Sequence, residues 1–177
     1  MPSGCGLIMN FLTKSECTQW RADHGRTVPF RSELLRQKGA PAAMRFAVPA
    51  DAGARVSLCR TLWSEEDWQK DAERLLIVEE WGVWPSGEHP PLFMKLRSAF
   101  GEARPMIEAP GHLCRKDDAD DGLSFLILCA LFLWDCTLYK DGGGMVFVSH
   151  DEYGVVVEPL EDDMSRLRSR LQHLNVL

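Results

Sequence analysis

The chain lacks an apolar segment long enough to cross a membrane. Its longest uninterrupted apolar run is the ten residues Phe125–Trp134, whereas a membrane-spanning helix needs about 20. No apolar stretch precedes Cys5, as it would in a secretory or lipoprotein leader. We therefore expect a cytoplasmic protein without membrane contact, in which residues 125–134 belong to a buried helix.

Two further absences limit the chemistry that the sequence indicates. The six cysteines contain no Cys-x-x-Cys pair, and outside a secretory setting reduced thiols are expected. The glycines of 142–144 lack the Gly-Lys-Ser/Thr ending of a phosphate-binding loop. This stretch predicts the tip of a hairpin, and no motif in the chain calls for a cofactor.

Charge is distributed unevenly along the chain. Residues 1–60 carry nine Lys/Arg and four Asp/Glu, whereas residues 61–177 carry 11 Lys/Arg and 22 Asp/Glu, within a net charge of −6. The acidic part would repel phosphate backbones and attract basic partners. The basic residues are scattered rather than clustered, which argues against nucleic-acid binding. We therefore expect a basic protein as the partner.

Length and composition predict one globular α+β domain over residues 1–177, because the apolar share of 45% is ordinary and no internal repeat occurs. Thr13-x-x-Glu16 has the spacing of a capping box, with Gly25 placed to end that helix. Ser64 is followed by three acids, which predicts a second helix reaching about Gly82. Further helices are expected at 30–38, 91–100 (burying Leu92, Leu96 and Phe100), 122–134 and from 161 onward (burying Met164, Leu167, Leu171 and Leu174).

Strand signals are clearest in the last third of the chain. Alternation and turn-forming glycines predict a meander with strands at 134–140, 145–150 and 154–158. Earlier strands are expected at 43–48, 55–62 and 104–108, with turns at 50–53 and 110–112. The fold we expect is an antiparallel sheet that includes this C-terminal three-stranded meander, with helices packed on one side.

The expected hairpin tip sets a register that brings two polar residues together. A four-residue loop makes Lys140 face Met145, and counting back makes Asp135 face His150. Such a carboxylate stabilises an imidazolium, and it also resembles the group that orients a general base or a metal ligand. The alternative is an ordinary cross-strand polar pair, worth about 0.2–1 kcal/mol.

Two acids directly follow this histidine. Asp151 and Glu152 could act with His150 as a metal-binding or acid/base cluster. Adjacent strand residues point to opposite faces, so the four residues of 149–152 converge only where the backbone turns. A solvated turn is the alternative interpretation.

Two other histidines and two tryptophans are candidate binding residues. His89 and His112 lie beside proline and glycine, and with His150 they are one hypothesis for a three-histidine metal site. Loop histidines bonded to the backbone are the alternative. Trp81 and Trp84 border a polar loop, where they either line a binding groove with these histidines or pack as part of the core.

Part of the sequence resembles an uncharacterised bacterial family. The resemblance covers about the C-terminal half and is carried by four segments: Glu80–Glu88, Leu96–Ser98, Ala109–Leu113 and Ser149–Tyr153. It implies no known activity, and therefore no catalytic residue. It does imply that the loops near Trp84, His112 and His150 belong to one feature of the fold.

Two classes of function remain open. The first is a non-catalytic, acidic binding protein of the immunity or inhibitor type that neutralises a basic partner. The acidic C-terminal two-thirds and the lack of a convincing catalytic set favour it. The second is a metal-dependent hydrolase built on His89, His112 and His150. We rank the binding protein first.

Overall fold

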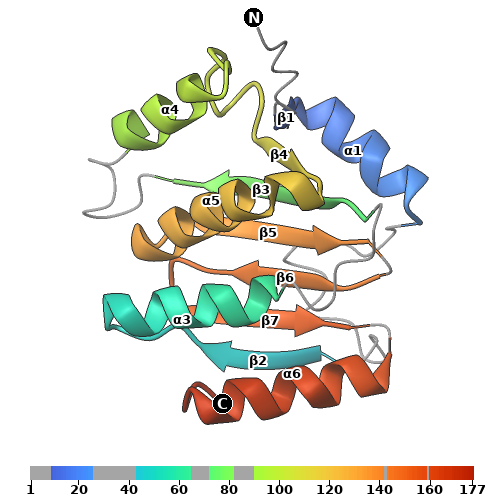
Figure 1. Ribbon diagram of the computed structural model, residues 1–177, viewed down its shortest axis with the longest axis vertical. Coiled ribbons are helices and arrows are strands. Elements are labelled where there is room, and N and C mark those ends of the chain that lie inside the picture. Colours follow the sequence, from blue (N-terminus) through green and yellow to red (C-terminus); the bar gives the residue numbers. More distant parts are fainter. Residues whose placement is uncertain (1–8, 26–42, 65–71, 82–89, 142, 159) are drawn as a thin grey trace, which may run out of the picture.

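The fold is built on one antiparallel sheet of seven strands in the order β1-β4-β3-β5-β6-β7-β2 (Figure 1). The computed structural model describes residues 9–25, 43–64, 72–81, 90–141, 143–158 and 160–177. The strands are β1 (Asn10–Leu12), β2 (Ala43–Ala47), β3 (Arg74–Glu80), β4 (Gly111–Cys114), β5 (Asp135–Lys140), β6 (Met145–Val148) and β7 (Tyr153–Val157). All neighbouring pairs are antiparallel. The expected meander β5–β6–β7 is therefore confirmed, with β3 added on one side and β2 on the other.

Five α-helices within the described residues pack on this sheet. They are α1 (Lys14–Asp23), α3 (Ala52–Trp63), α4 (Pro90–Ala99), α5 (Ala119–Leu131) and α6 (Glu161–His173). The main core lies on one face and includes Leu76 and Leu138; α5 and α3 lie across this face, while α4 lies near the β4 end of the sheet and α6 runs beside β2 (Figure 1). The other face, which we call the α1 face, carries a smaller cluster in which Cys17 and Trp20 of α1 pack against Leu75. The α+β class is confirmed, but helices occupy both faces.

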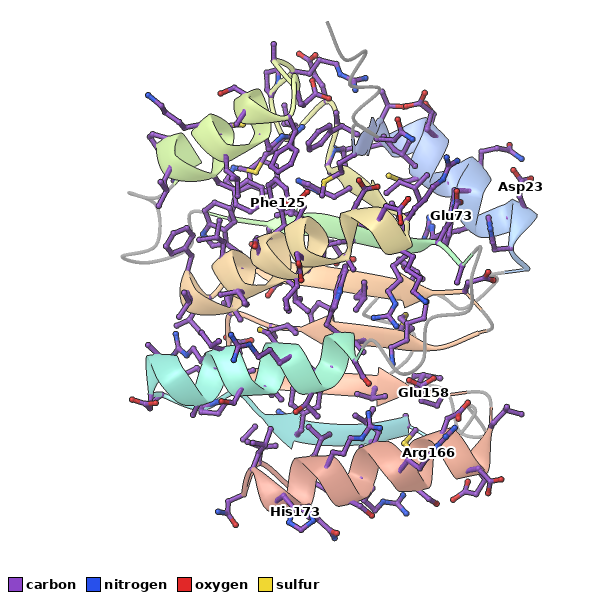
Figure 2. The ribbon with its side chains drawn as sticks, in the orientation of Figure 1. Asp23, Glu73, Phe125, Glu158, Arg166 and His173 are labelled. Atoms are coloured by element: carbon purple, nitrogen blue, oxygen red, sulfur yellow. The ribbon has the colours of Figure 1, made fainter. Side chains whose placement is uncertain are left out.

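Helix α5 is the central element of the main core. None of the described helices is both long and apolar enough to span a bilayer, and α5 has 13 residues. Phe125, labelled in Figure 2, projects from α5 into this core together with Leu126 and Cys129. The longest apolar run of the chain is thus explained by burial against the sheet.

Several local signals predicted their elements correctly. The backbone N–H of Glu16 donates to Thr13 Oγ1 at 3.3 Å, and the Thr13 N–H donates to Glu16 Oε2 at 2.7 Å, which completes the capping box of α1. The expected strand at 43–48 and the helices near 91, 122 and 161 also form. In α6 Met164, Leu167 and Leu171 are buried as expected, whereas Leu174, also expected there, follows the last turn and is half-buried. The helix expected at 30–38 lies outside the described residues.

Residues 55–62 form helix α3, so the strand expected there was wrong. The expected turn at 50–53 is the start of this helix, because the Asp51 carboxylate caps it by accepting from the backbone N–H of Ala54 at 2.8 Å. Leu58 and Leu62 alternate with polar residues, but they are also four residues apart. Both are buried on one side of α3, so the period of the helix explains their spacing.

Residues 74–80 form β3, so the long helix expected to reach Gly82 was wrong there; Ser64, its expected N-cap, ends α3, and residues 65–71 lie outside the described residues. Residues 74–78 are all buried, because β3 is a central strand with packed side chains on both faces. Such a strand shows an unbroken apolar run instead of alternation, and short runs of this kind do not distinguish strand from helix.

The segment between α4 and β4 also differs from expectation. Residues 104–108 make turns instead of a strand, and Gly111–Cys114, placed partly in a turn, forms β4. Helix α4 buries Phe93 and Arg97, whereas Leu92 is 56% exposed. The buried side of α4 is therefore rotated by one residue. A polar residue occupies it because the Arg97 guanidinium donates to a backbone carbonyl just before β4 at 2.7 Å.

The β5–β6 hairpin is offset by one residue from the expected register. Tyr139, instead of Lys140, pairs with Met145, because the turn between the strands closes one residue earlier. The predicted ladder pairing of Asp135 with His150 was therefore wrong. β6 ends at Val148, so His150 lies beyond the ladder.

Candidate functional site

Three strand ends bring a histidine and two carboxylates together at one edge of the sheet. β3 and β6 end at the edge where β5 and β7 begin (Figure 1). Glu80 is the last residue of β3, Asp135 is the first of β5, and His150 follows β6 by two residues. One potential ligand atom from each of these side chains lies within 4.8 Å of the other two. We call these three residues the His150 centre.

The contact between Asp135 and His150 is confirmed, although it does not arise from the predicted register. Asp135 Oδ1 accepts from the backbone N–H of His150 at 2.6 Å and lies 2.9 Å from His150 Nδ1. Residues 149–152 form a turn after β6, so the alternation of a strand no longer decides where His150 points. The turn places the imidazole beside the carboxylate.

The turn that carries His150 is fixed by its own backbone. Glu152 has a φ of 60°, a left-handed conformation that residues other than glycine adopt infrequently. Its N–H donates to the Ser149 carbonyl at 3.2 Å, and the Asp151 N–H donates to Ser149 Oγ at 3.2 Å. His150 Nε2 then lies 3.4 Å from Asp151 Oδ1. The imidazole is therefore held between the carboxylates of Asp135 and Asp151.

Burial changes steeply across this group. The side chain of Asp135 is fully buried, that of His150 is 16% exposed, and that of Asp151 is 62% exposed. Glu80 is exposed as well. The centre thus extends from a buried carboxylate to the surface, where two further carboxylates meet solvent.

A β-bulge explains why two consecutive glutamates serve one face. The ladder between β3 and β5 shifts register between Val78 and Glu80, so that Glu80 pairs with Asp135. Glu79 accepts a hydrogen bond from Thr137 Oγ1 at 2.5 Å. Thr137 and Asp135 are two residues apart on β5 and therefore share the α1 face. The bulge adds the extra residue that re-aims a side chain.

A buried arginine of α3 stabilises the turn of 149–152. Arg55 of α3 donates from Nε to the Pro49 carbonyl at 2.6 Å and from Nη1 to the Leu131 carbonyl at 3.3 Å. Its Nη2 lies 3.4 Å from Glu152 Oε1. Arg55 therefore ties α3, the end of α5 and the turn together. The sequence interpretation missed it because it placed Arg55 on the polar side of a strand.

A cavity of about 490 Å³ lies on the α1 face beside the centre. Its walls come from α1, from the end of β3 and from the segment before β4, and include Lys14, Cys17, Arg21, Glu79, Trp81 and Ile107. Glu79 and Trp81 flank Glu80 in the sequence, although the three residues of the His150 centre do not themselves line the cavity. Burial raises the pKa of the Cys17 thiol to about 11, so this thiol stays protonated at neutral pH and is a poor nucleophile. The volume suits a small-molecule site.

His112 lies in the main core instead of in a turn. Its ring is fully buried, and its centroid is 5.3 Å from that of Phe11, 5.6 Å from Phe93 and 4.7 Å from Phe125. Nδ1 lies 3.1 Å from the carbonyl of Pro110. Burial lowers the pKa of His112 to about 3, so the ring is neutral at physiological pH. The potential metal ligands that converge among the described residues do not include it.

The remaining predicted residues have mixed outcomes. Trp81 lines the cavity and also packs against the main core, whereas His112, expected to share a groove with it, does not line this cavity. His89 and Trp84 lie outside the described residues. Glu80 was missed because it was expected in the last turn of a helix, where nothing pointed to Asp135 or His150. A β-bulge leaves no signal in this sequence that would have moved it to the centre.

The chain matches no family model, no curated protein and no solved structure. Its function is therefore inferred from the His150 centre, the carboxylates around it and the adjoining cavity.

Proposed function

We propose that this protein is a non-catalytic, acidic binding protein of the immunity or inhibitor type, which neutralises a basic partner protein. The observation that carries the proposal is a group of exposed carboxylates at the edge of the sheet that holds the His150 centre. They are Glu80, Asp151 and Glu152, which we call the acidic rim.

The rim is pre-organised, which favours binding. Arg55 holds Glu152, the turn of 149–152 fixes Asp151, and the end of a central strand carries Glu80. Side chains that are already ordered lose less conformational entropy on association. Carboxylates at a surface also increase the rate of encounter with a positively charged partner.

The cavity beside the rim offers a second element of recognition. Trp81 lines it, and tryptophan is among the residues that most often dominate binding energy at protein interfaces. Acidic residues next to an aromatic anchor match a partner that presents a basic residue beside an apolar one. The excess of acids in residues 61–177 adds a long-range attraction of the same sign.

The hydrolase based on three histidines receives no support from the described residues. His112 is neutral, fully buried and surrounded by phenylalanine rings. His150 instead lies among carboxylates. We therefore do not extend the proposal to that enzyme.

The test compares two variants with equal changes in net charge. Asp151→Lys with Glu152→Gln alters the rim, whereas Asp23→Lys with Asp117→Asn alters exposed acids at the opposite edge of the sheet, where Figure 2 marks Asp23. The partner is isolated from the source cells by affinity capture at low salt, purified, and titrated by calorimetry against each variant.

We expect the rim variant to bind at least about tenfold more weakly, or roughly 1.4 kcal/mol, and to lose part of the salt dependence. The control should stay close to the wild type. The proposal is wrong if both variants bind alike, or if the specific partner is itself acidic.

A further inference from the structure

We propose that Glu80, Asp135 and His150 bind a divalent transition-metal ion of the zinc class, with a coordination position left for water or for a ligand. This inference is independent of the acidic-binding proposal, because it concerns the protein alone. Three side chains from three separate strand ends converge there, and each supplies an atom type that zinc accepts.

The separations are close to those of a metal site. Zinc–nitrogen and zinc–oxygen bonds of about 2.0–2.2 Å in a tetrahedral arrangement put ligand atoms roughly 3.4 Å apart. The three ligand atoms here lie within 4.8 Å of one another. An ion would draw these atoms closer together, and Glu80 and the imidazole are the two ligands that reach the surface.

The groups that surround the proposed ligands also resemble those around a metal site. The Asp135 carboxylate is fully buried and is fixed by the backbone N–H of His150 at 2.6 Å. His150 Nδ1 and Asp135 Oδ1 lie 2.9 Å apart, so one ion can replace the proton between them. The carboxylate at the other ring nitrogen is then placed to orient the ring in the manner common around histidine ligands. Asp151, at 3.4 Å from the other ring nitrogen, adds negative charge that favours a cation.

The donor set selects the class of ion. One imidazole with two carboxylates suits Zn²⁺, and to a smaller degree Mn²⁺, whereas Mg²⁺ and Ca²⁺ favour sites built from oxygen alone. Structural zinc sites normally have four protein ligands, so three protein ligands describe an open site. The cavity of about 490 Å³ is lined by Glu79 and Trp81, the sequence neighbours of Glu80, and not by the three proposed ligands themselves.

The experiment is calorimetric titration of the full-length, chelator-treated protein with ZnCl₂, MnCl₂ and MgCl₂. We expect one zinc ion per chain, weaker binding of Mn²⁺ and no saturable binding of Mg²⁺. Glu80→Gln and His150→Ala should each weaken zinc binding at least tenfold. Glu108→Gln and His173→Ala, which alter exposed residues elsewhere, are the matched controls and should bind as the wild type does.

Cobalt substitution gives a second readout that does not depend on activity. A Co²⁺ complex at this centre should show visible d–d bands without the intense charge-transfer band of a cysteine-based site, and Glu80→Gln should remove them. Circular dichroism checks that each variant is folded, and the exposed position of Glu80 makes that variant the safest one. Absence of saturable zinc binding, or equal binding by Glu80→Gln and Glu108→Gln, would overturn the inference.

Discussion

Two histidines of this chain occupy opposite environments. Within the main core, His112 is enclosed by Phe11, Phe93 and Phe125. We call these four residues the aromatic core. His150 lies in a turn at the edge of the sheet, between a buried carboxylate and an exposed one. Both residues follow glycine- or serine-containing segments in the sequence, yet one supports packing and the other is available for chemistry.

The difference shows that neighbours in space, and not neighbours in sequence, decide what a histidine does. The strand β4 lies under α5, so its inward side chain at position 112 meets aromatic rings. The turn after β6 leaves the ladder and meets the first residue of β5. We therefore expect perturbations of the aromatic core to reduce stability and perturbations of the His150 centre to reduce binding.

The largest effect on stability should come from the aromatic core. Phe125→Ala removes a ring that is fully buried, so we expect the free energy of unfolding to fall by about 3–5 kcal/mol. Denaturant unfolding followed by circular dichroism measures it. Leu92→Ala, at a side chain that is 56% exposed, is the control and should change stability by less than about 0.5 kcal/mol. Equal losses would show that Phe125 is not central to this core.

The second largest effect on stability should come from low pH, through His112. In the folded protein its pKa is about 3, well below the ordinary 6.5, so between these values the unfolded chain binds a proton that the folded chain does not. Stability therefore falls as the pH drops below about 6.5. The contribution of this group between pH 7 and pH 5 is about 2 kcal/mol.

A variant that cannot take up this proton isolates the effect. In His112→Leu the unfolding free energy should decline by about 2 kcal/mol less over the same pH range, whatever its value at pH 7. His173→Leu, on the exposed side of α6, should follow the wild type. Parallel pH profiles for all three proteins would mean that His112 is not held neutral by burial.

The fold could be predicted where local and tertiary signals agree. The capping box at Thr13 and the glycine tip before Met145 are local, and the structure keeps both α1 and the β5–β6 hairpin. Errors occurred where one pattern fits two structures. Leu58 and Leu62 satisfy an alternating strand as well as a helix, and the buried run at 74–78 lacks any period because β3 is packed on both faces.

The candidate site was also predicted only in part. The proximity of Asp135 and His150 follows from the hairpin, and the one-residue error in register did no harm because His150 lies in a turn. Glu80 and Arg55 could not be placed, since the first depends on a β-bulge and the second on a segment mistaken for a strand. Contacts of this kind join residues that are far apart in the sequence, so local sequence patterns do not predict them.

Within the His150 centre, the buried carboxylate should matter most for stability. Asp135→Ala removes the acceptor that the backbone N–H of His150 uses at 2.6 Å, and a buried donor left without a partner costs about 1–3 kcal/mol. We expect a loss near the lower end, about 1.5 kcal/mol, because the turn of 149–152 is close to solvent. Asp135→Asn keeps an acceptor oxygen and should lose less. A loss as large as that of Phe125→Ala would abolish the contrast between the two regions.

The smallest effect on stability should come from the exposed carboxylate of the same centre. Asp151 is 62% exposed and lies 3.4 Å from His150 Nε2, and surface pairs of this kind contribute about 0–1 kcal/mol. Asp151→Asn should therefore change the unfolding free energy by less than about 0.5 kcal/mol, while it weakens binding to a basic partner. A destabilisation beyond about 1 kcal/mol would instead assign Asp151 a structural role, because in that case its charge would be supporting the turn that carries His150.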